Sequence, residues 1–253
     1  MQVPDFSLLN DLYLPASAKP NDEFEKEYLV VREKEQRIYS DDQVRKLPDI
    51  TRKHPHFKEW LIRRKSCRKL IRYLESKKSI LNILEIGCGN GWFSYHLSRI
   101  PGSKVIALDI NLTELQQAAR VFGKNSKLKF IFGDIRSGIL KDLKFDIILF
   151  AASIQYFADL HEIIDIALAH LIQNGEIHLI DSHFYHPKDI PAARERTRLY
   201  YQSLGIPDMK NHYYHHSITE LSRYQYKVLF NPETALNRFF GSNPFFWICV
   251  KNV

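Results

Sequence analysis

Cysteine and long apolar runs are scarce in this 253-residue chain. Its three cysteines, Cys67, Cys88 and Cys249, have neither the spacing of a disulfide framework nor that of a metal-binding cluster. No run of about 18 apolar residues occurs, so we expect no membrane span and no membrane partner. The first residues include several acids and lack the basic and then apolar pattern of a secretion signal. Together these absences favour a reduced, cytoplasmic compartment.

Basic residues outnumber acidic ones but form no dense patch. The net charge of +7 could indicate an anionic partner. The densest basic run, residues 63–69, falls on an expected helix with acids on either side. A solvated helix face explains it, so we do not expect a nucleic-acid partner. With 45% hydrophobic residues, the chain is long enough for one sizeable domain or one domain with elaborations.

The segment 82–93 is the most informative part of the sequence. Its apolar residues up to Ile86 are typical of a buried strand. Gly87, Gly89 and Gly91 follow, and such a loop leaves bare backbone open to a ligand. The helix expected from Trp92 would direct N–H donors and partial positive charge at that ligand. Strand, glycine loop and helix predict a cofactor half-site, and the alternative is a tight turn without a ligand.

The glycine spacing distinguishes between cofactors. A dinucleotide fingerprint is Gly-x-Gly-x-x-Gly, and Trp92 occupies the place of its third glycine. From Glu85 to Gly91 the pattern is instead Glu-x-Gly-x-Gly-x-Gly, which resembles motif I of the class I S-adenosylmethionine-dependent methyltransferases, of the small-molecule type 11/12 kind. The resemblance implies S-adenosyl-L-methionine as cofactor, S-adenosyl-L-homocysteine as product, and Glu85 at the methionine end. It covers residues 80–182 well, the last two expected strands loosely, and residues 1–79 and 183–225 hardly at all.

Strands and helices alternate regularly along the core. Strands are expected at 82–86, 104–108, 128–132, 145–150 and 176–180, and helices at 92–99, 113–122 and 159–172, the last ended by Asn174-Gly175. This alternation predicts an α/β fold with a parallel sheet and right-handed crossovers. Two more strands are expected at 226–230 and 244–250. The resemblance implies a Rossmann-like, seven-stranded, mostly parallel sheet in the order 3-2-1-4-5-7-6.

The remaining segments surround this core. An extended or loosely helical arm is expected over residues 1–20, and helices over 22–37, 41–45 and 56–77. The predicted organisation is a helical N-terminal extension or cap over 1–79 and a cofactor-binding core over 80–253. The core includes a lid-like insertion over 183–225, after strand five.

Acidic residues follow the second and third core strands. Asp109 can accept hydrogen bonds from both hydroxyls of a ribose, although it could instead cap the next helix. By resemblance, Asp134 would bind the adenine amino group, with Ile110 and Ile135 on the ring faces. The alternative for Asp134 is a simple Gly-Asp turn.

The end of the fourth strand flanks the crevice in which open α/β sheets bind ligands. Ala151 and Ala152 leave room there for cofactor and acceptor, and Tyr156 could line the rim. The segment lacks the Asp/Asn-Pro-Pro-Tyr motif of enzymes that methylate a flipped base. The predicted cofactor-binding residues are Glu85, Gly87, Cys88, Gly89, Asn90, Gly91, Trp92, Asp109, Ile110, Asp134, Ile135, Ala151, Ala152 and Tyr156.

The insertion is rich in histidine and tyrosine. His183, Tyr185 and His186 follow the fifth strand closely, so they are the candidates for catalysis, with His183 as a general base. A zinc site at His212, His215 and His216 is an alternative, but a fourth ligand is not evident, and we expect no metal. Surface histidines on a mobile lid are the other alternative.

The sequence thus predicts methyl transfer from S-adenosyl-L-methionine to a small-molecule acceptor, a hydroxyl or amine of a natural-product or sugar-like compound. Three alternatives stay open: an RNA methyltransferase, a nicotinamide dehydrogenase, and a non-catalytic module that keeps the cofactor fold. The acceptor and the oligomeric state are not determined by the sequence.

Overall fold

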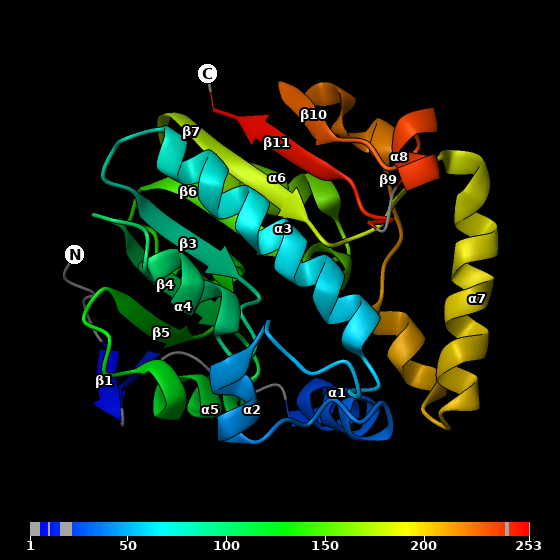
Figure 1. Cartoon of the computed structure of the whole chain (residues 1–253), viewed down its shortest axis with the longest axis horizontal. Coiled ribbons are helices and arrows are strands. Elements are labelled where there is room, and N and C mark those ends of the chain that lie inside the picture. The colour runs from blue at the N-terminus through cyan, green and yellow to red at the C-terminus, as the bar shows by residue number, and fades with distance from the viewer. Residues whose placement is uncertain (1–5, 10, 16–21, 241–242, 253) are drawn as a thin grey trace.

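A nine-stranded sheet forms the centre of the computed structural model, which describes residues 6–9, 11–15, 22–240 and 243–252 (Figure 1). Hydrophobic strands alternate with amphipathic helices along the chain, which is the pattern that builds such a sheet. In spatial order the strands are β1 (Phe6–Leu9), β2 (Leu12–Pro15), β5 (Leu128–Phe132), β4 (Lys104–Asp109), β3 (Asn82–Ile86), β6 (Phe145–Ala151), β7 (Leu171–Ile180), β11 (Trp247–Lys251) and β10 (Tyr226–Phe230).

The predicted strand order is confirmed for the seven strands from β5 to β10. Strands β5, β4, β3, β6 and β7 are parallel. Strand β11 runs antiparallel to β7, and β10 runs antiparallel to β11. The carboxyl ends of β3, β4, β5 and β6 therefore meet at one edge of the sheet.

The prediction of seven strands is too small by two. Strands β1 and β2 form an antiparallel hairpin, and β2 pairs in parallel with β5, with Leu12 opposite Phe130. Leu12 is buried, so this short apolar segment covers an otherwise open sheet edge. The expected N-terminal arm is thus extended at residues 6–9 and 11–15, and the rest of it lies outside the described residues.

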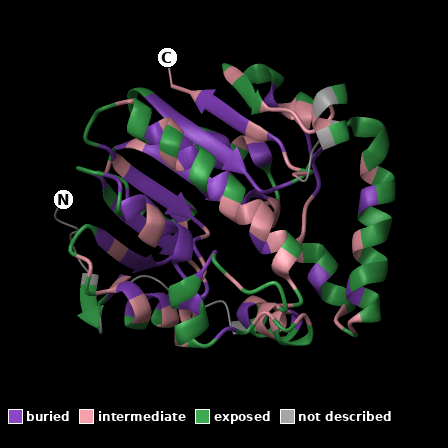
Figure 2. Cartoon of the chain, viewed as in Figure 1, coloured by how far each residue is buried: buried purple, intermediate pink, exposed green. Residues whose placement is uncertain are grey.

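Helices cover both faces of the sheet, whose central strands are largely buried (Figure 2). Successive residues of a strand point to opposite faces and so belong to two separate cores. Helices α3 (Phe57–Ser76), α4 (Trp92–Ser98) and α5 (Leu112–Phe122) pack on the face that includes Ile83. Helix α6 (Leu160–Ala169) packs on the opposite face, against Leu84 and Ile86. Ile83 and Leu84, which are neighbours in β3, therefore point to opposite faces of the sheet.

A third apolar cluster lies apart from the sheet. Val31 of α1 (Asp22–Lys34) packs there with Tyr201 of α7 (Ile190–Ser203) and Met209 of the 3₁₀-helix η4 (Pro207–His212). Segments far apart in the sequence thus meet in one small core. The short helix α2 (Asp41–Lys46) lies against α5, where Arg120 pairs with Asp41 at 2.9 Å. The short strands β8 (Phe184–Tyr185) and β9 (His216–Ser217) pair in parallel at the base of the insertion, and helix α8 (Ala235–Phe240) precedes β11.

The end of the helix before the fifth core strand was predicted wrongly, and the helix expected over 22–37 likewise ends early, at Lys34. The helix expected over 159–172 begins as predicted, with Asp159 as N-cap, but α6 ends at Ala169. Strand β7 already starts at Leu171, which pairs with Phe145, so Asn174-Gly175 lies within a strand and does not end a helix. Asn174 has a φ of 60° and donates its N–H to the carbonyl of Asn252, which marks an irregularity of the strand.

No helix in the described ranges combines the length and the apolar character that a membrane crossing needs.

Candidate functional site

A cavity of about 300 Å³ lies at the carboxyl ends of the parallel strands. We call it the main cavity. Each of four strands contributes residues at or just after its carboxyl end: Gly87 and Gly89 after β3, Asp109 and Ile110 at the end of β4, Asp134 and Ile135 after β5, and Ala152 and Ser153 after β6. The predicted site residues from four separate segments therefore meet in one cavity, at the position where open α/β sheets bind ligands.

The three loop glycines have positive φ angles but different functions. A Cβ at Gly87 would lie 2.4 Å from Cβ of Ser153, and one at Gly91 would lie 2.5 Å from the ring of Phe130. These two glycines allow close packing within the protein. At Gly89, a Cβ would meet a side chain of the cavity wall, the carboxylate of Glu114, at 3.2 Å. Of the three, Gly89 is therefore the one that leaves backbone open toward the cavity.

Asp109 is held in place by backbone groups. Its Oδ2 accepts a hydrogen bond from the N–H of Gly89 at 2.7 Å, and its Oδ1 accepts one from the N–H of Asn111 at 2.8 Å. Burial raises the pKa of Asp109 above its usual value. The N-cap of α5 is Asn111, which accepts from the N–H of Glu114 at 2.9 Å. Asp109 is therefore not needed as a helix cap.

Asp134 forms a turn and also lines the main cavity. Its carboxylate accepts from the backbone N–H of Arg136 at 2.9 Å and pairs with the Arg136 guanidinium at 2.5 Å. It thereby caps the 3₁₀-helix η1 (Ile135–Ser137), and it also lines the main cavity. Ile110 and Ile135 line the same cavity.

A smaller space of about 110 Å³, the junction cavity, adjoins the glycine loop. Burial raises the pKa of Glu85 there to about 8, although the hydroxyl of Ser94 donates a hydrogen bond to its carboxylate. Oδ1 of Asn90 is buried and has no hydrogen-bond partner among the described residues. The cavity is also lined by further predicted residues, namely Gly87, Cys88, Gly89, Trp92, Ala151, Ala152 and Tyr156.

A third space of about 360 Å³, the outer cavity, lies between α1, α3 and the insertion. Its walls are tyrosines and arginines from these three segments, with Tyr200 and Tyr201 supplied by α7. Tyr28 and Tyr156 line all three cavities, and their ring centroids are 5.9 Å apart. The three cavities therefore meet at this pair of rings.

The three predicted catalytic residues line none of these cavities. The ring of His183 lies 4.6 Å from that of Phe245, and burial lowers the pKa of His183. Tyr185 packs 5.5 Å from His215, measured between ring centroids. His186 Nε2 lies 3.0 Å from Glu233 at the surface. Their catalytic role stays a prediction, without a contact to the cavities that would support it.

The crowded histidines of the insertion face different partners. The ring of His212 lies 5.1 Å from that of Phe24 and lines the main cavity. His215 Nε2 lies 2.9 Å from the hydroxyl of Thr197. His216 Nε2 lies 3.1 Å from the carbonyl of Ile154. The three imidazole rings therefore have separate neighbours.

Several cavity residues were not predicted from the sequence. Helix α1 contributes Phe24, Tyr28 and Arg32, and α5 contributes Glu114. Burial raises the pKa of Glu114 to about 7, against the lowering effect of Arg32. The sequence predicted a helix over 22–37 but not that its residues would line a cavity. An acid in the first turn of a helix is common, so Glu114 gave no signal of its own.

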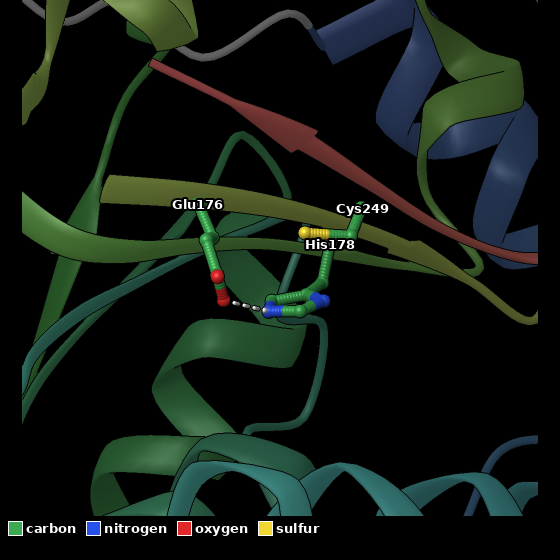
Figure 3. Close-up of side chains that lie close together, drawn as sticks. All are labelled: Glu176, His178 and Cys249. Atoms are coloured by element: carbon green, nitrogen blue, oxygen red, sulfur yellow. Dashed lines mark ion pairs between the residues drawn. The ribbon is translucent and has the colours of Figure 1, made fainter. Parts of the chain in front are cut away.

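One buried group away from the cavities resembles a metal site in its residue types. Ligand atoms of Glu176, His178 and Cys249 lie within 4.8 Å of one another (Figure 3). The indole N–H of Trp247 donates to Nδ1 of His178 at 3.1 Å, so the ring proton of neutral His178 is on Nε2, which lies 3.3 Å from Glu176. Lys77 lies 2.8 Å from the same carboxylate and lowers the pKa of Glu176 along with His178. An ion-pair network explains this group without a metal.

Comparisons with known proteins agree with this arrangement. Residues 83–175 match the family described as "Methyltransferase domain". Malonyl-[acyl-carrier protein] O-methyltransferase 1 of Ilyobacter polytropus is 36% identical over 92 residues, which cover 36% of this chain and 34% of that protein. The corresponding enzyme of Acetivibrio thermocellus is 32% identical over 101 residues, 39% of this chain and 35% of the other. The chain thus matches about a third of the length of these curated relatives.

Solved structures extend the similarity of fold to most of the chain. The plantazolicin methyltransferase BpumL in complex with SAH superposes with a TM-score of 0.54 at 18% identity, over 92% of this chain and 97% of the other. The YcgJ protein from Bacillus subtilis gives a TM-score of 0.52 at 17% identity, over 73% and 96%. Residues 83–175 thus carry a methyltransferase domain, and most of the chain shares its overall fold with the plantazolicin methyltransferase BpumL. The motif from Glu85 to Gly91 lies within the matched residues.

Proposed function

We propose that this chain transfers the methyl group of S-adenosyl-L-methionine to a small-molecule acceptor and leaves S-adenosyl-L-homocysteine. The observation that supports this most is the meeting of the three cavities at Tyr28 and Tyr156. Two ligands could lie in adjoining spaces with their reacting ends toward one another. Methyl transfer needs such an alignment of nucleophile, methyl carbon and sulfur.

The residues of the main and junction cavities fit the cofactor. Asp109 would accept hydrogen bonds from the ribose hydroxyls, and Asp134 would bind the adenine, with Ile110 and Ile135 along the ring. The junction cavity would receive the methionine end, where the buried Glu85 carboxyl and the unpartnered Oδ1 of Asn90 offer acceptors for an ammonium group. The other members of the proposed site are Gly87, Cys88, Gly89, Gly91, Trp92, Ala151, Ala152 and Tyr156.

When bound, the cofactor supplies an electrophilic methyl group. The chain's contribution is to orient both ligands and to exclude water. Glu114 and Glu85 are carboxyls whose burial keeps their pKa values near neutrality, so either could carry a proton beside the ligands. Whether His183 removes a proton from the acceptor depends on a movement of the insertion that would bring its ring to the outer cavity.

The acceptor side would be formed by the N-terminal cap and the insertion. The cluster of Val31, Tyr201 and Met209 supports a cap over residues 1–79 that acts together with a lid over 183–225. The curated relatives are named for a malonyl group on a carrier protein, and one structural relative for the natural product plantazolicin. These names support a small or carrier-bound acceptor. The three cysteines are buried and unpaired, which supports a reduced, cytoplasmic compartment.

Thermal shift with S-adenosyl-L-homocysteine (SAH), NAD and RNA tests the proposal. A ligand that binds only the native state raises the midpoint of unfolding, so SAH should raise it in a concentration-dependent way. A shift with NAD alone would indicate a dehydrogenase. Tight RNA binding with a steep salt dependence would indicate an RNA methyltransferase. If none of the three ligands binds, the proposal fails in favour of a non-catalytic module.

A further inference from the structure

Four arginines line the outer cavity, together with only two carboxylates. The cations are Arg32 of α1, Arg37 after it, Arg63 of α3 and Arg196 of α7, and the carboxylates are Glu35 and Glu59. The remaining lining residues are uncharged. The walls of this cavity therefore carry an excess of two positive charges.

Two of the arginines form ion pairs with these two carboxylates. Nη1 and Nη2 of Arg37 donate to Glu59 at 2.8 and 2.5 Å, and its Nε lies 2.9 Å from Glu35. Arg63 donates to Glu59 at 3.0 Å. The hydroxyl of Tyr200 also donates to Glu35. Arg37 and Arg63 are thus paired within the protein.

Arg32 and Arg196 lack comparable partners. The closest carboxylate oxygen to Arg32 is that of Glu35, at 3.8 Å, and the buried Nε of Arg32 has no hydrogen-bond partner among the described residues. Arg196 is exposed and forms no ion pair within the described part of the chain, and its side chain lies within hydrogen-bonding reach of Tyr185. Burial disfavours the charge on Arg32, yet Tyr28 and Glu114 raise the pKa of Arg32 above its usual value, so the cation persists. Arg32 is half-buried, and a partly buried cation gains from a ligand that completes its hydrogen bonds.

We propose that the acceptor is a small organic acid whose carboxylate binds in the outer cavity, with Arg32 and Arg196 as its counter-charges. This inference rests on the proposed function, because it concerns the acceptor of the same reaction. A guanidinium matches a carboxylate in shape and can form two parallel hydrogen bonds with it. The tyrosine rings of Tyr200, Tyr201 and Tyr213 provide flat walls for the rest of the molecule.

The test uses two probes of the same shape and different charge. The wild-type protein is saturated with SAH and titrated in a calorimeter with benzoate or with benzamide. We expect benzoate to bind and benzamide to bind at least tenfold more weakly. Arg32→Gln should weaken benzoate binding by roughly 10- to 100-fold, the effect of a lost charge-assisted hydrogen bond. Arg196→Gln, at an exposed position, should weaken it by about two- to fivefold.

A matched control and a separate readout make the result decisive. Arg198 lies on the same helix as Arg196 but outside the cavity, where it pairs with Glu195 at 2.7 Å. The substitution Arg198→Gln should therefore leave benzoate binding unchanged. SAH affinity is measured for each variant, because Arg32 also lines the junction cavity.

The proposal is overturned if benzoate and benzamide bind equally well, or if benzoate does not bind measurably at millimolar concentration. It is also overturned if Arg32→Gln and Arg196→Gln both bind benzoate with unchanged affinity. If phenyl phosphate binds more tightly than benzoate, the proposal of a carboxylate acceptor is wrong, and the cavity binds a phosphate. If the wild-type protein does not bind SAH at all, the proposed function itself is wrong.

Discussion

The backbone N–H of Gly89 donates a hydrogen bond of 2.7 Å to the carboxylate of Asp109. The glycine loop after β3 and the acid at the end of β4 are thereby joined before any ligand binds. The second oxygen of Asp109 accepts from Asn111, so the carboxylate is fixed from two sides. Such preorganisation lowers the ordering cost of binding. Asp109 therefore shapes the main cavity as well as lining it.

Replacing Asp109 by alanine should weaken SAH binding. The variant loses the proposed ribose contacts and releases the N–H of Gly89. A charge-assisted hydrogen bond contributes about 1.5–3 kcal/mol, so the affinity should fall by roughly one to two orders of magnitude. Calorimetric titration measures this directly. Asp142→Ala, at an exposed position away from the cavities, is the control and should bind SAH like the wild type. An unchanged affinity in Asp109→Ala would disprove the ribose assignment.

A valine at Gly89 should abolish SAH binding while the chain stays folded. Gly89 has a φ of 52°, and its Cβ position points to the Glu114 carboxylate at the cavity wall. A branched side chain would occupy space that the cofactor needs, at a strain of about 1–3 kcal/mol. Gly138→Val is a matched control, because Gly138 has a φ of 72° but nothing within 4 Å of its Cβ position. It should show a similar loss of stability and normal SAH binding. Normal binding by folded Gly89→Val would mean that the loop is only a turn.

Local sequence patterns predicted much of the lining of the main cavity. The motif from Glu85 to Gly91 and the acids after the next two strands follow from local rules about strand ends and glycine. The contribution of Tyr28 and Arg32 could not be derived in this way, because it depends on how α1 packs over a loop some sixty residues later. Pairing of Leu12 with β5 is likewise a tertiary effect. Asn174 shows the limit of turn signals, since the same dipeptide type can end a helix or interrupt a strand.

The buried carboxyl of Glu85 predicts a pH dependence of stability in the protein without ligand. Burial raises the pKa of Glu85 from 4.5 to about 8, so the native state holds a proton that the unfolded chain has released. Protonated Glu85 stabilises the native state fully when the pH is below the pKa of Glu85 in the unfolded chain. This stabilisation is lost as the pH rises toward the pKa of Glu85 in the native state. Between about pH 5 and pH 8, the free energy of unfolding should therefore fall by roughly 2–4 kcal/mol through this group.

Glu85→Gln isolates this effect. The amide resembles the protonated carboxyl and can still accept the hydrogen bond from Ser94. Urea unfolding at both ends of the pH range should show a flatter profile for Glu85→Gln than for the wild type. Glu75→Gln, on the exposed side of α3, should follow the wild-type profile. Parallel profiles for wild type and Glu85→Gln would mean that Glu85 titrates normally.

Cofactor binding should also rigidify the cap, because α1 and η4 supply walls of the main cavity. Phe24 and Tyr28 come from α1 and His212 from η4, and all three line the cavity beside the glycine loop. Contacts to a ligand in the main cavity would therefore connect α1 and η4 to the sheet, and local opening of both segments should become rarer. Hydrogen exchange with and without SAH should show slower exchange in residues 22–34 and 207–214. The hairpin strand β10, at the other end of the sheet, is the internal control and should exchange at the same rate in both states. Unchanged exchange in α1 and η4 at saturating SAH would mean that the cap does not close on the cofactor, and its function would then be limited to the outer cavity.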